Sequence, residues 1–336
     1  MAQEQTQEQI RSGKELILAT KPFAKEDRHR SWLYLLSTLL LLICAWVGTF
    51  AFPWLGVRLV FSVITALIMV RLFVIYHDFL HHTILHRSPL ATIIMASYGV
   101  LVLVPPSIWK RSHDYHHNHN SKLFSASIGS YPIATRAKYF SMSNSERRIY
   151  LAVRHPITII FGYFSMFMLG MCLNSFLSNP RRHIDSIFAL VLHFTIVALV
   201  IIHFGWLVWL VSIFIPFMIS SFLGAYLFYA QHNFPGATFA RNEEWKYDRA
   251  ALESSSYMDM SPFMRWCTAN ISYHHIHHLN ARIPFYRLPE TMAAIPELQH
   301  PKVTSLRPTD MMKCFRLKVW DPEANKMIGF KEMGVE

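Results

Sequence analysis

Six apolar stretches alternate with polar segments along the chain, and their lengths predict which of them cross a membrane. A helix needs about 20 apolar residues to span a bilayer. Four stretches are long enough, namely residues 32–52, 54–76, 185–203 and 205–230. In the second, Arg58 and Arg71 lie close enough to the ends for their side chains to reach the interface. We therefore expect four transmembrane helices, arranged as two antiparallel pairs.

The other two apolar stretches are predicted not to span. Residues 89–105 are short and end at a pair of prolines, which fits a re-entrant or interfacial segment. Residues 156–176 begin at Pro156, and the pair Arg181-Arg182 that follows them belongs on the cytoplasmic side by the positive-inside rule. We therefore expect 156–176 to form a non-spanning or hairpin element.

Composition agrees with an integral membrane protein that has sizeable polar parts. Hydrophobic residues make up 52% of the 336 positions, and the mean hydropathy is +0.24. The net charge of +11 lies mostly beside the apolar stretches, where Lys and Arg mark the cytoplasmic face, so no nucleic-acid partner is expected. The four cysteines show no paired spacing and are expected to be reduced.

Three histidine clusters, called boxes below, carry the chemistry. The first reads H-D-F-L-H-H and the other two read H-x-x-H-H; their members are His77, His81 and His82, then His113, His116 and His117, then His274, His277 and His278. Positions i, i+3 and i+4 share one face of a helix, so each box points its imidazoles to one side. Three such faces supply about nine nitrogens, too many for one tetrahedral zinc but enough for two metal ions. A joint site also requires all three boxes on one side of the membrane, which again excludes 156–176 as a span and places both termini with the boxes.

The order of the boxes resembles that of the membrane fatty acid desaturases. The C-terminal half is most similar to the acyl-lipid branch of the Δ12 or ω6 type, through the segments 228–234, 250–257, 270–279 and 282–289. The likeness runs from about residue 30 to 290. It implies an all-α membrane protein with a cytoplasmic helical cap, residues 1–30 as a polar cytoplasmic tail, 31–300 as the desaturase domain and 301–336 as a cytoplasmic C-terminal tail.

The same resemblance implies a chemistry and a ligand set. A non-haem centre of two iron ions would use O₂ and two electrons to introduce a double bond into an acyl chain, favoured as an acyl-lipid and otherwise an acyl-CoA. His77 and either or both of His81 and His82 carry over as ligands, together with the second and third boxes. His232 matches an extra histidine that the family supplies after the last membrane helix.

Neighbouring polar residues leave alternatives open. Asp78 and Asp114 either orient imidazoles or lie on a solvated helix face. The stearoyl-CoA type has an asparagine one turn before the extra histidine, where this chain has Phe228; either Asn270, Gln231 or Asn233 substitutes for it, or the coordination differs. Arg282 and Arg287 could hold an anion or pair with Glu290.

Electrons have to come from a separate protein such as a ferredoxin or cytochrome b5. The sequence contains no glycine-rich nucleotide loop, no haem-binding His-Pro-Gly-Gly segment and no CxxC motif. Basic and aromatic residues around Lys110 and between Arg136 and Arg154 suit contact with lipid headgroups or an anionic donor.

Two other classes of protein share part of this pattern. A related di-iron membrane hydroxylase or ketolase, acting on carotenoids or alkanes, also has histidine boxes. A histidine-rich metal transporter should place its ligands within the spans, and a bis-histidine haem protein would show a Soret band. The boxes here follow the ends of apolar stretches, which favours the oxidase.

Overall fold

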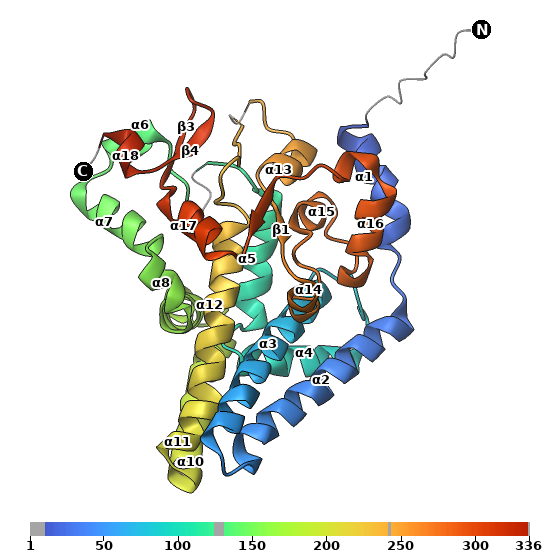
Figure 1. The fold of residues 1–336 in the computed structure, drawn as a ribbon, viewed down its shortest axis with the longest axis vertical. Helices are drawn as coiled ribbons and strands as arrows, with labels where there is room; N and C mark the ends of the chain where they lie inside the picture. Colours follow the sequence, from blue (N-terminus) through green and yellow to red (C-terminus); the bar gives the residue numbers. More distant parts are fainter. Residues whose placement is uncertain (1–10, 124–130, 241–242, 335–336) are drawn as a thin grey trace.

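The computed structural model describes residues 11–123, 131–240 and 243–334, and two pairs of long helices form its lower half (Figure 1). The first pair is α2 (Arg28–Ala51) and α3 (Leu55–Leu80); the second is α10 (Ile184–Phe204) and the bent helix Trp206–Ala230. Among the described residues, these four helices are the ones long and apolar enough to cross a membrane. They coincide with the four predicted spans to within a few residues at each end, so the predicted fold class is confirmed.

In the fourth span, side chains of the first two spans donate to backbone carbonyls that precede Pro216. It consists of α11 (Trp206–Trp209), the π-helical turn η3 (Leu210–Phe214) and α12 (Ile215–Ala230). Pro216 has no N–H to donate to the carbonyl of Ser212. The indole Nε1 of Trp46 on α2 donates to that carbonyl at 3.1 Å instead. The contact ties the fourth span to the first.

The two stretches predicted not to span form shorter or bent helices. Helix α4 (Pro89–Leu101) turns by 92° into α5 (Pro106–Asn118). The other stretch divides into α8 (Pro156–Ile160), the π-helix η2 (Tyr163–Asn174) and α9 (Ser175–Ser178), which are too short for a span. Gly162 at their junction lets the segment approach α12 closely, since a Cβ there would lie 2.9 Å from the Cβ of Ala225.

The remaining elements form a cap above the helix pairs (Figure 1). Its helices are α1 (Gly13–Thr20), η1 (Lys21–Ala24), α6 (Arg136–Ser141), α7 (Asn144–Val153), α13 (Tyr247–Glu253), α14 (Pro262–Cys267), α15 (His274–Leu279), η4 (Phe285–Arg287), α16 (Leu288–Ala294), η5 (Pro296–Leu298), α17 (Pro308–Arg316) and α18 (Phe330–Met333). Strand β1 (Tyr257–Asp259) pairs in parallel with β2 (Val303–Ser305), and β3 (Val319–Asp321) pairs antiparallel with β4 (Lys326–Ile328). Helices α1 and α18, near the two ends of the chain, both lie in the cap. The predicted domain limits at residues 30 and 300 stay a prediction.

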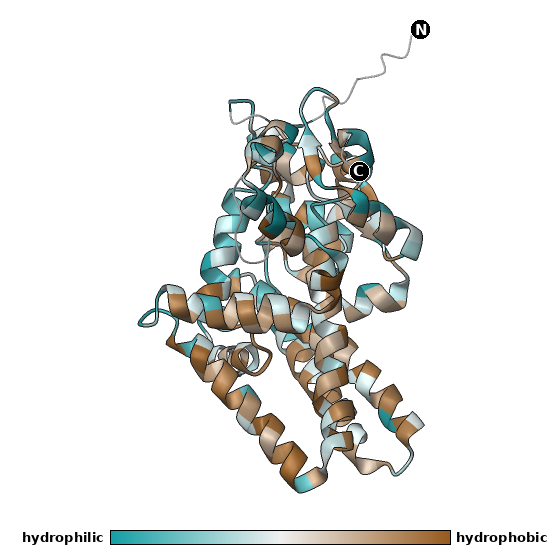
Figure 2. Cartoon of the chain, turned by 90° about the vertical axis from the view of Figure 1, so that its left-hand side faces the viewer, coloured by the Kyte–Doolittle hydropathy of each residue, from teal (hydrophilic) through white to brown (hydrophobic). Residues whose placement is uncertain are grey.

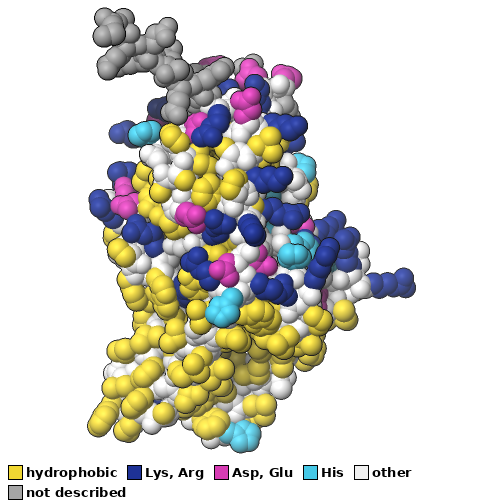
Figure 3. Space-filling view, turned by 90° about the vertical axis from the view of Figure 1, so that its right-hand side faces the viewer, with side chains coloured by type: hydrophobic (Ala, Val, Ile, Leu, Met, Phe, Trp, Pro, Cys, Tyr) yellow, Lys and Arg dark blue, Asp and Glu magenta, His cyan; other side chains and the backbone are white. Residues whose placement is uncertain are grey.

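Hydropathy separates the two halves of the molecule. The long helices are predominantly hydrophobic, while the cap is largely hydrophilic (Figure 2). On the face shown in Figure 3, Lys and Arg side chains gather above the hydrophobic lower half. Both distributions suit a protein whose cap lies in water at one side of a bilayer.

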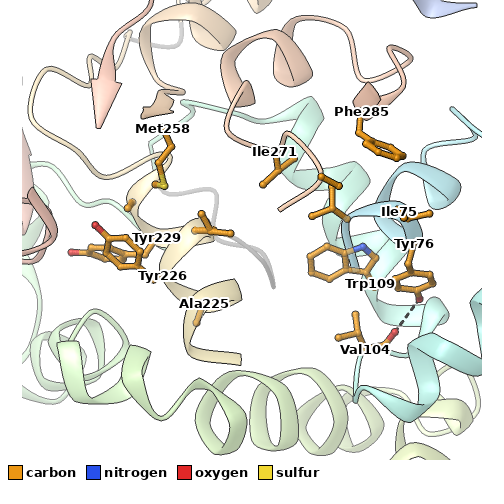
Figure 4. Close-up of a cluster of buried hydrophobic side chains, with 14 of the residues drawn as sticks. Ile75, Tyr76, Val104, Trp109, Ala225, Tyr226, Tyr229, Met258, Ile271 and Phe285 are labelled. Atoms are coloured by element: carbon orange, nitrogen blue, oxygen red, sulfur yellow. Dashed lines mark hydrogen bonds between the residues drawn. The ribbon is translucent and has the colours of Figure 1, made fainter. Parts of the chain in front are cut away.

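A buried core joins the cap to the top of the spans. Figure 4 shows Ala225, Tyr226 and Tyr229 of α12 on one side and Ile75, Tyr76 and Trp109 on the other. The Tyr76 hydroxyl donates to the carbonyl of Val104 at 2.9 Å, which fixes the bend between α4 and α5 against α3. Phe228 of α12 packs its ring 6.1 Å from that of Phe73 on α3 and 5.3 Å from that of Trp109 on α5, so these three helices lie side by side.

Candidate metal centre

Helix ends at the base of the cap bring the histidine boxes together. The first box lies where α3 ends, the second on the last turns of α5 and the third on α15, while His232 follows the end of α12. The i, i+3, i+4 spacing gives each helical box one inward face, as the sequence predicts. Nine of the ten predicted site histidines form two groups, and within each group the ligand nitrogens lie within 4.8 Å of one another.

The first cluster contains His77, His81, His113, His117 and His277. The Nε2 atoms of His77 and His113 are 2.7 Å apart, and that of His117 lies 3.1 Å from those of both His113 and His277. His81 completes the group, its ring centroid 4.6 Å from those of His77 and His117.

The second cluster contains His116, His232, His274 and His278. The Nε2 of His232 lies 3.1 Å from that of His116 and 2.9 Å from that of His274, which in turn lies 3.0 Å from that of His278. The other ring nitrogen of His232, Nδ1, is 3.0 Å from the carbonyl oxygen of Ser254. A hydrogen bond there holds the proton on Nδ1 and turns Nε2 toward the cluster.

Burial keeps these imidazoles neutral, which is the form that binds metal. Desolvation lowers the pKa of His232 to about 4 and that of His277 to about 3. It also lowers the pKa of His274 and His278, and neighbouring histidines add to the effect. Lone pairs are therefore available at neutral pH.

The donor set fits transition-metal ions. All nine donors are imidazole nitrogens, which suit iron, copper, nickel or zinc. Among the described residues, the buried Nδ1 atoms of His113, His117, His274 and His278 have no hydrogen-bond partner, so their Nε2 atoms are the nitrogens with close neighbours. Groups of five and four converging imidazole donors match two ions better than one.

One predicted site histidine, His82, belongs to neither cluster. His82 has φ +57° and an exposed side chain, so the chain turns away from the clusters directly after His81. Two further histidines of the box segments belong to neither cluster: His275 is buried with Nε2 3.4 Å from the carbonyl of Leu298, and His119 packs on Tyr115. His193 of α10 forms a hydrogen bond with the hydroxyl of Tyr163 in η2.

The two aspartates of the boxes differ. Asp78 is buried, with Oδ1 3.2 Å from Nδ1 of His77, and its Oδ2 accepts the backbone N–H of Phe285 at 2.8 Å. Asp114 is half exposed and pairs with Lys110 at 2.9 Å. The structure therefore assigns the orienting role to Asp78 and the solvated position to Asp114.

None of the three side chains suggested as a substitute for the missing asparagine points its amide at a cluster. The amide of Gln231 donates to the carbonyl of Ile271, that of Asn270 donates to the carbonyl of Phe285, and that of Asn233 donates to the carbonyl of Cys314. Phe228 instead packs its ring 5.3 Å from that of Trp109.

An apolar cavity leads from the helix pairs to both clusters. It lies between α3, α4, η2 and α12. Most of its walls are aliphatic or aromatic, for example Met69, Phe73 and Leu227, and its histidines are His77 of the first cluster and His274 of the second. A long hydrocarbon chain in this cavity would end beside both groups of imidazoles.

The sequence matches known proteins over the parts that build this site. Residues 54–309 match the family model described as fatty acid desaturase. The chain is 30% identical to a Bacillus subtilis protein named fatty acid desaturase, over 95% of this chain and 91% of the relative. It is 22% identical to a protein of Anabaena variabilis named sn-1 oleoyl-lipid 12-desaturase, over 81% and 78%. Because the matched residues include both clusters and the cavity, the chain belongs to the fatty acid desaturase family and is an oxidoreductase of that class.

Proposed function

We propose that this protein desaturates the acyl chain of a membrane lipid at a centre of two iron ions, using O₂ and two electrons from a separate donor protein. The observation that carries the proposal is the apolar cavity whose inner end contacts one histidine of each cluster, His77 and His274. In this assignment the first cluster holds one ion and the second cluster holds the other. Bound iron would supply the oxidant for an unactivated C–H bond, which side chains alone cannot provide.

The reaction balances with the proposed components. Two adjacent methylene groups lose one hydrogen each; these hydrogens, one O₂, two protons and two electrons give two water molecules and one double bond. The protein holds the chain in place and excludes water along the walls of the cavity. Met69, Phe73 and Leu227 offer the hydrocarbon no polar partner.

An acyl-lipid is favoured over acyl-CoA because the cavity lies among the helices of the spans, at the level of the acyl chains of the surrounding lipid. The relative named as an oleoyl-lipid desaturase supports the same substrate class.

Product and metal analysis test the proposal. Cells that express the chain should gain a monounsaturated or further unsaturated fatty acid in their methyl ester profile, and the purified protein should hold about two irons per chain, since two donor groups are present. A hydroxylated or ketone product would favour the related hydroxylases. Active protein with one zinc and no iron would overturn the di-iron assignment.

His81 belongs to the first cluster and His82 to neither cluster, so the two residues predict different mutational effects. His81→Ala should reduce desaturation by more than about tenfold, because it removes a donor from the first cluster. His82→Ala should keep most of the activity, since the His82 side chain points away from both clusters. Fatty acid profiling of the two variants at equal expression measures the difference; equal losses would contradict the placement.

Asp78 is expected to orient His77 and thereby set the affinity of the first site. Asp78→Asn should lower metal affinity or activity by about 10- to 100-fold, because the amide offers His77 a weaker acceptor. Asp114→Asn is the matched control and should behave like wild type, since Asp114 only pairs with Lys110. Iron retention during dialysis against a chelator distinguishes them, and equal retention would remove Asp78 from the site.

The cap is proposed to face the cytoplasm. Arg182, exposed in the turn before α10, should then be reached from the cytoplasmic side. In a variant whose single cysteine is introduced by Arg182→Cys, that cysteine should be protected from a membrane-impermeant maleimide in intact cells and labelled after lysis. A cysteine at Pro53, in the turn between α2 and α3, is the control and should be labelled in intact cells. Labelling of the Arg182 position in intact cells would reverse the orientation.

A further inference from the structure

A positively charged surface surrounds the loop that follows the first box. We call it the box-one surface and define it by five residues: His82, His86, Arg87, Lys110 and Arg282. The side chains of Lys110 and His86 are 40% and 46% exposed, and those of His82, Arg87 and Arg282 are also exposed. The five come from three distant parts of the chain, so the fold, and not a local run of charge, assembles the surface.

The backbone holds the loop of this surface in one conformation. His82, Leu85 and Arg87 all have positive φ angles, of +57°, +50° and +60°. The N–H of Leu85 donates to the carboxylate of Glu26 at 2.6 Å, and the Arg28 guanidinium donates to the carbonyl of His86 at 3.2 Å. Such constrained positions persist where the surrounding contacts fix them, so the charges are arranged before any partner arrives.

The box-one surface is also the outer edge of the first cluster. His81 is the one member of that cluster with a partly exposed residue surface. The Lys110 ammonium donates to the carbonyl of Leu80 at 3.3 Å, directly before His81 in the chain. The Thr83 hydroxyl, in the loop after His82, donates to the carbonyl of Ala281 at 2.7 Å, which places this loop beside Arg282.

Positive charge remains after the local carboxylates are accounted for. Asp114 pairs with Lys110, and Glu26 lies 3.8 Å from His86 and 4.0 Å from Arg28. Among the described residues, Arg87 and Arg282 form no ion pair. Two guanidinium groups are therefore available to an anionic partner.

We propose that the box-one surface is the docking site of an acidic, water-soluble one-electron carrier protein. The inference rests on the proposed function, because each turnover there requires two electrons from outside the chain. A positive surface steers an acidic protein toward it and raises the association rate. Docking here brings the carrier to the exposed edge of the first cluster.

The position of the surface favours a carrier protein over the lipid substrate as its partner. None of its five residues lines the apolar cavity, whose walls come from α3, α4, η2, α12 and the segment before α15. A substrate bound in the cavity therefore does not contact this surface. An electron carrier requires proximity to a cluster and does not need to reach the cavity.

Charge reversal with two kinds of reductant tests the docking site. The full-length enzyme in lipid nanodiscs is assayed with an acidic [2Fe–2S] ferredoxin and, separately, with dithionite, which needs no docking. Arg282→Glu should raise the KM for ferredoxin by about tenfold and leave kcat and the dithionite-driven yield unchanged. The wild-type KM should rise with salt, and that of the variant should change less. Arg282→Lys keeps the charge and should behave like wild type.

Lys331→Glu is the matched control, because Lys331 is exposed on α18, across the cap from α16 (Figure 1). It should leave the ferredoxin KM unchanged. The docking site is overturned if Arg282→Glu leaves the ferredoxin KM unaltered, if dithionite-driven yield falls equally, or if only binding to phosphatidylglycerol vesicles changes, which would identify a headgroup site. If wild type makes no product with either reductant, the proposed function fails instead.

Discussion

His113→Ala is expected to abolish desaturation while leaving a folded protein in the membrane. The Nε2 of His113 lies 2.7 Å from that of His77 and 3.1 Å from that of His117, so its loss opens the centre of the first cluster. The four spans are held by lipid and by helix packing, which the change does not touch. We expect product to fall by more than about a hundredfold and the iron content to fall with it, since incomplete coordination releases the ion.

Fatty acid profiles, iron content and the detergent-extracted yield of the variant measure these effects together. His300→Ala is the control, because His300 is exposed and belongs to neither cluster. It should retain nearly all activity. Product from His113→Ala comparable to wild type would show that the first cluster is not the reacting centre. A variant that is lost from the membrane would be replaced by His113→Gln, which has a similar length and no imidazole.

His232→Ala is expected to be as damaging as the loss of a box histidine. His232 lies outside all three boxes, yet its Nε2 is 3.1 Å from that of His116 and 2.9 Å from that of His274. Its other nitrogen is oriented by the carbonyl of Ser254, as expected for a ligand held in one tautomer. We expect more than about a hundredfold less product and about one iron per chain, because the first cluster remains complete.

His119→Ala is the matched control for this variant. His119 borders the same cavity as His116 and His232 but belongs to neither cluster. It should keep activity and both irons. Near-normal product from His232→Ala would remove His232 from the site and leave the eight box histidines of the two clusters as the ligand candidates.

The sequence was sufficient to predict the spans and the joint site because both depend on local pattern. Length and apolar content define α2, α3, α10 and the Trp206–Ala230 helix. The requirement that the boxes meet then excluded residues 156–176 as a span, and that segment is indeed broken into α8, η2 and α9.

The sequence did not predict which histidines of each box belong to which cluster. His113 and His117 stay together and His116 joins the second cluster; His274 and His278 stay together and His277 joins the first. In the second and third boxes, the i+4 histidine is turned by about 40° around the helix from the first one, and the i+3 histidine by about 60° in the opposite direction. These rotations follow from the spacing, but assigning each histidine to one of the two clusters requires knowing that α5 and α15 face each other.

The roles of His82 and Asp78 depend on contacts that no local pattern encodes. His82 turns outward because the helix ends at Leu80 and the chain takes a left-handed conformation two residues later. Asp78 is fixed by the N–H of Phe285, more than 200 residues further along the chain. The corresponding residue of the second box, Asp114, also follows the first histidine of its box, but it pairs with Lys110 at the surface.

Because each cluster takes histidines from both α5 and the last third of the chain, neither can be completed before that last third has been synthesised. The first cluster waits for His277, and the second waits for His232, His274 and His278. Under the proposed assignment, a nascent chain emerging from the ribosome with only its first two boxes has no full set of donors for either ion. Oxygen-activating metal would therefore be acquired only after the last span is inserted and the cap has closed over it, which protects an unfinished chain from the oxidant it is built to produce.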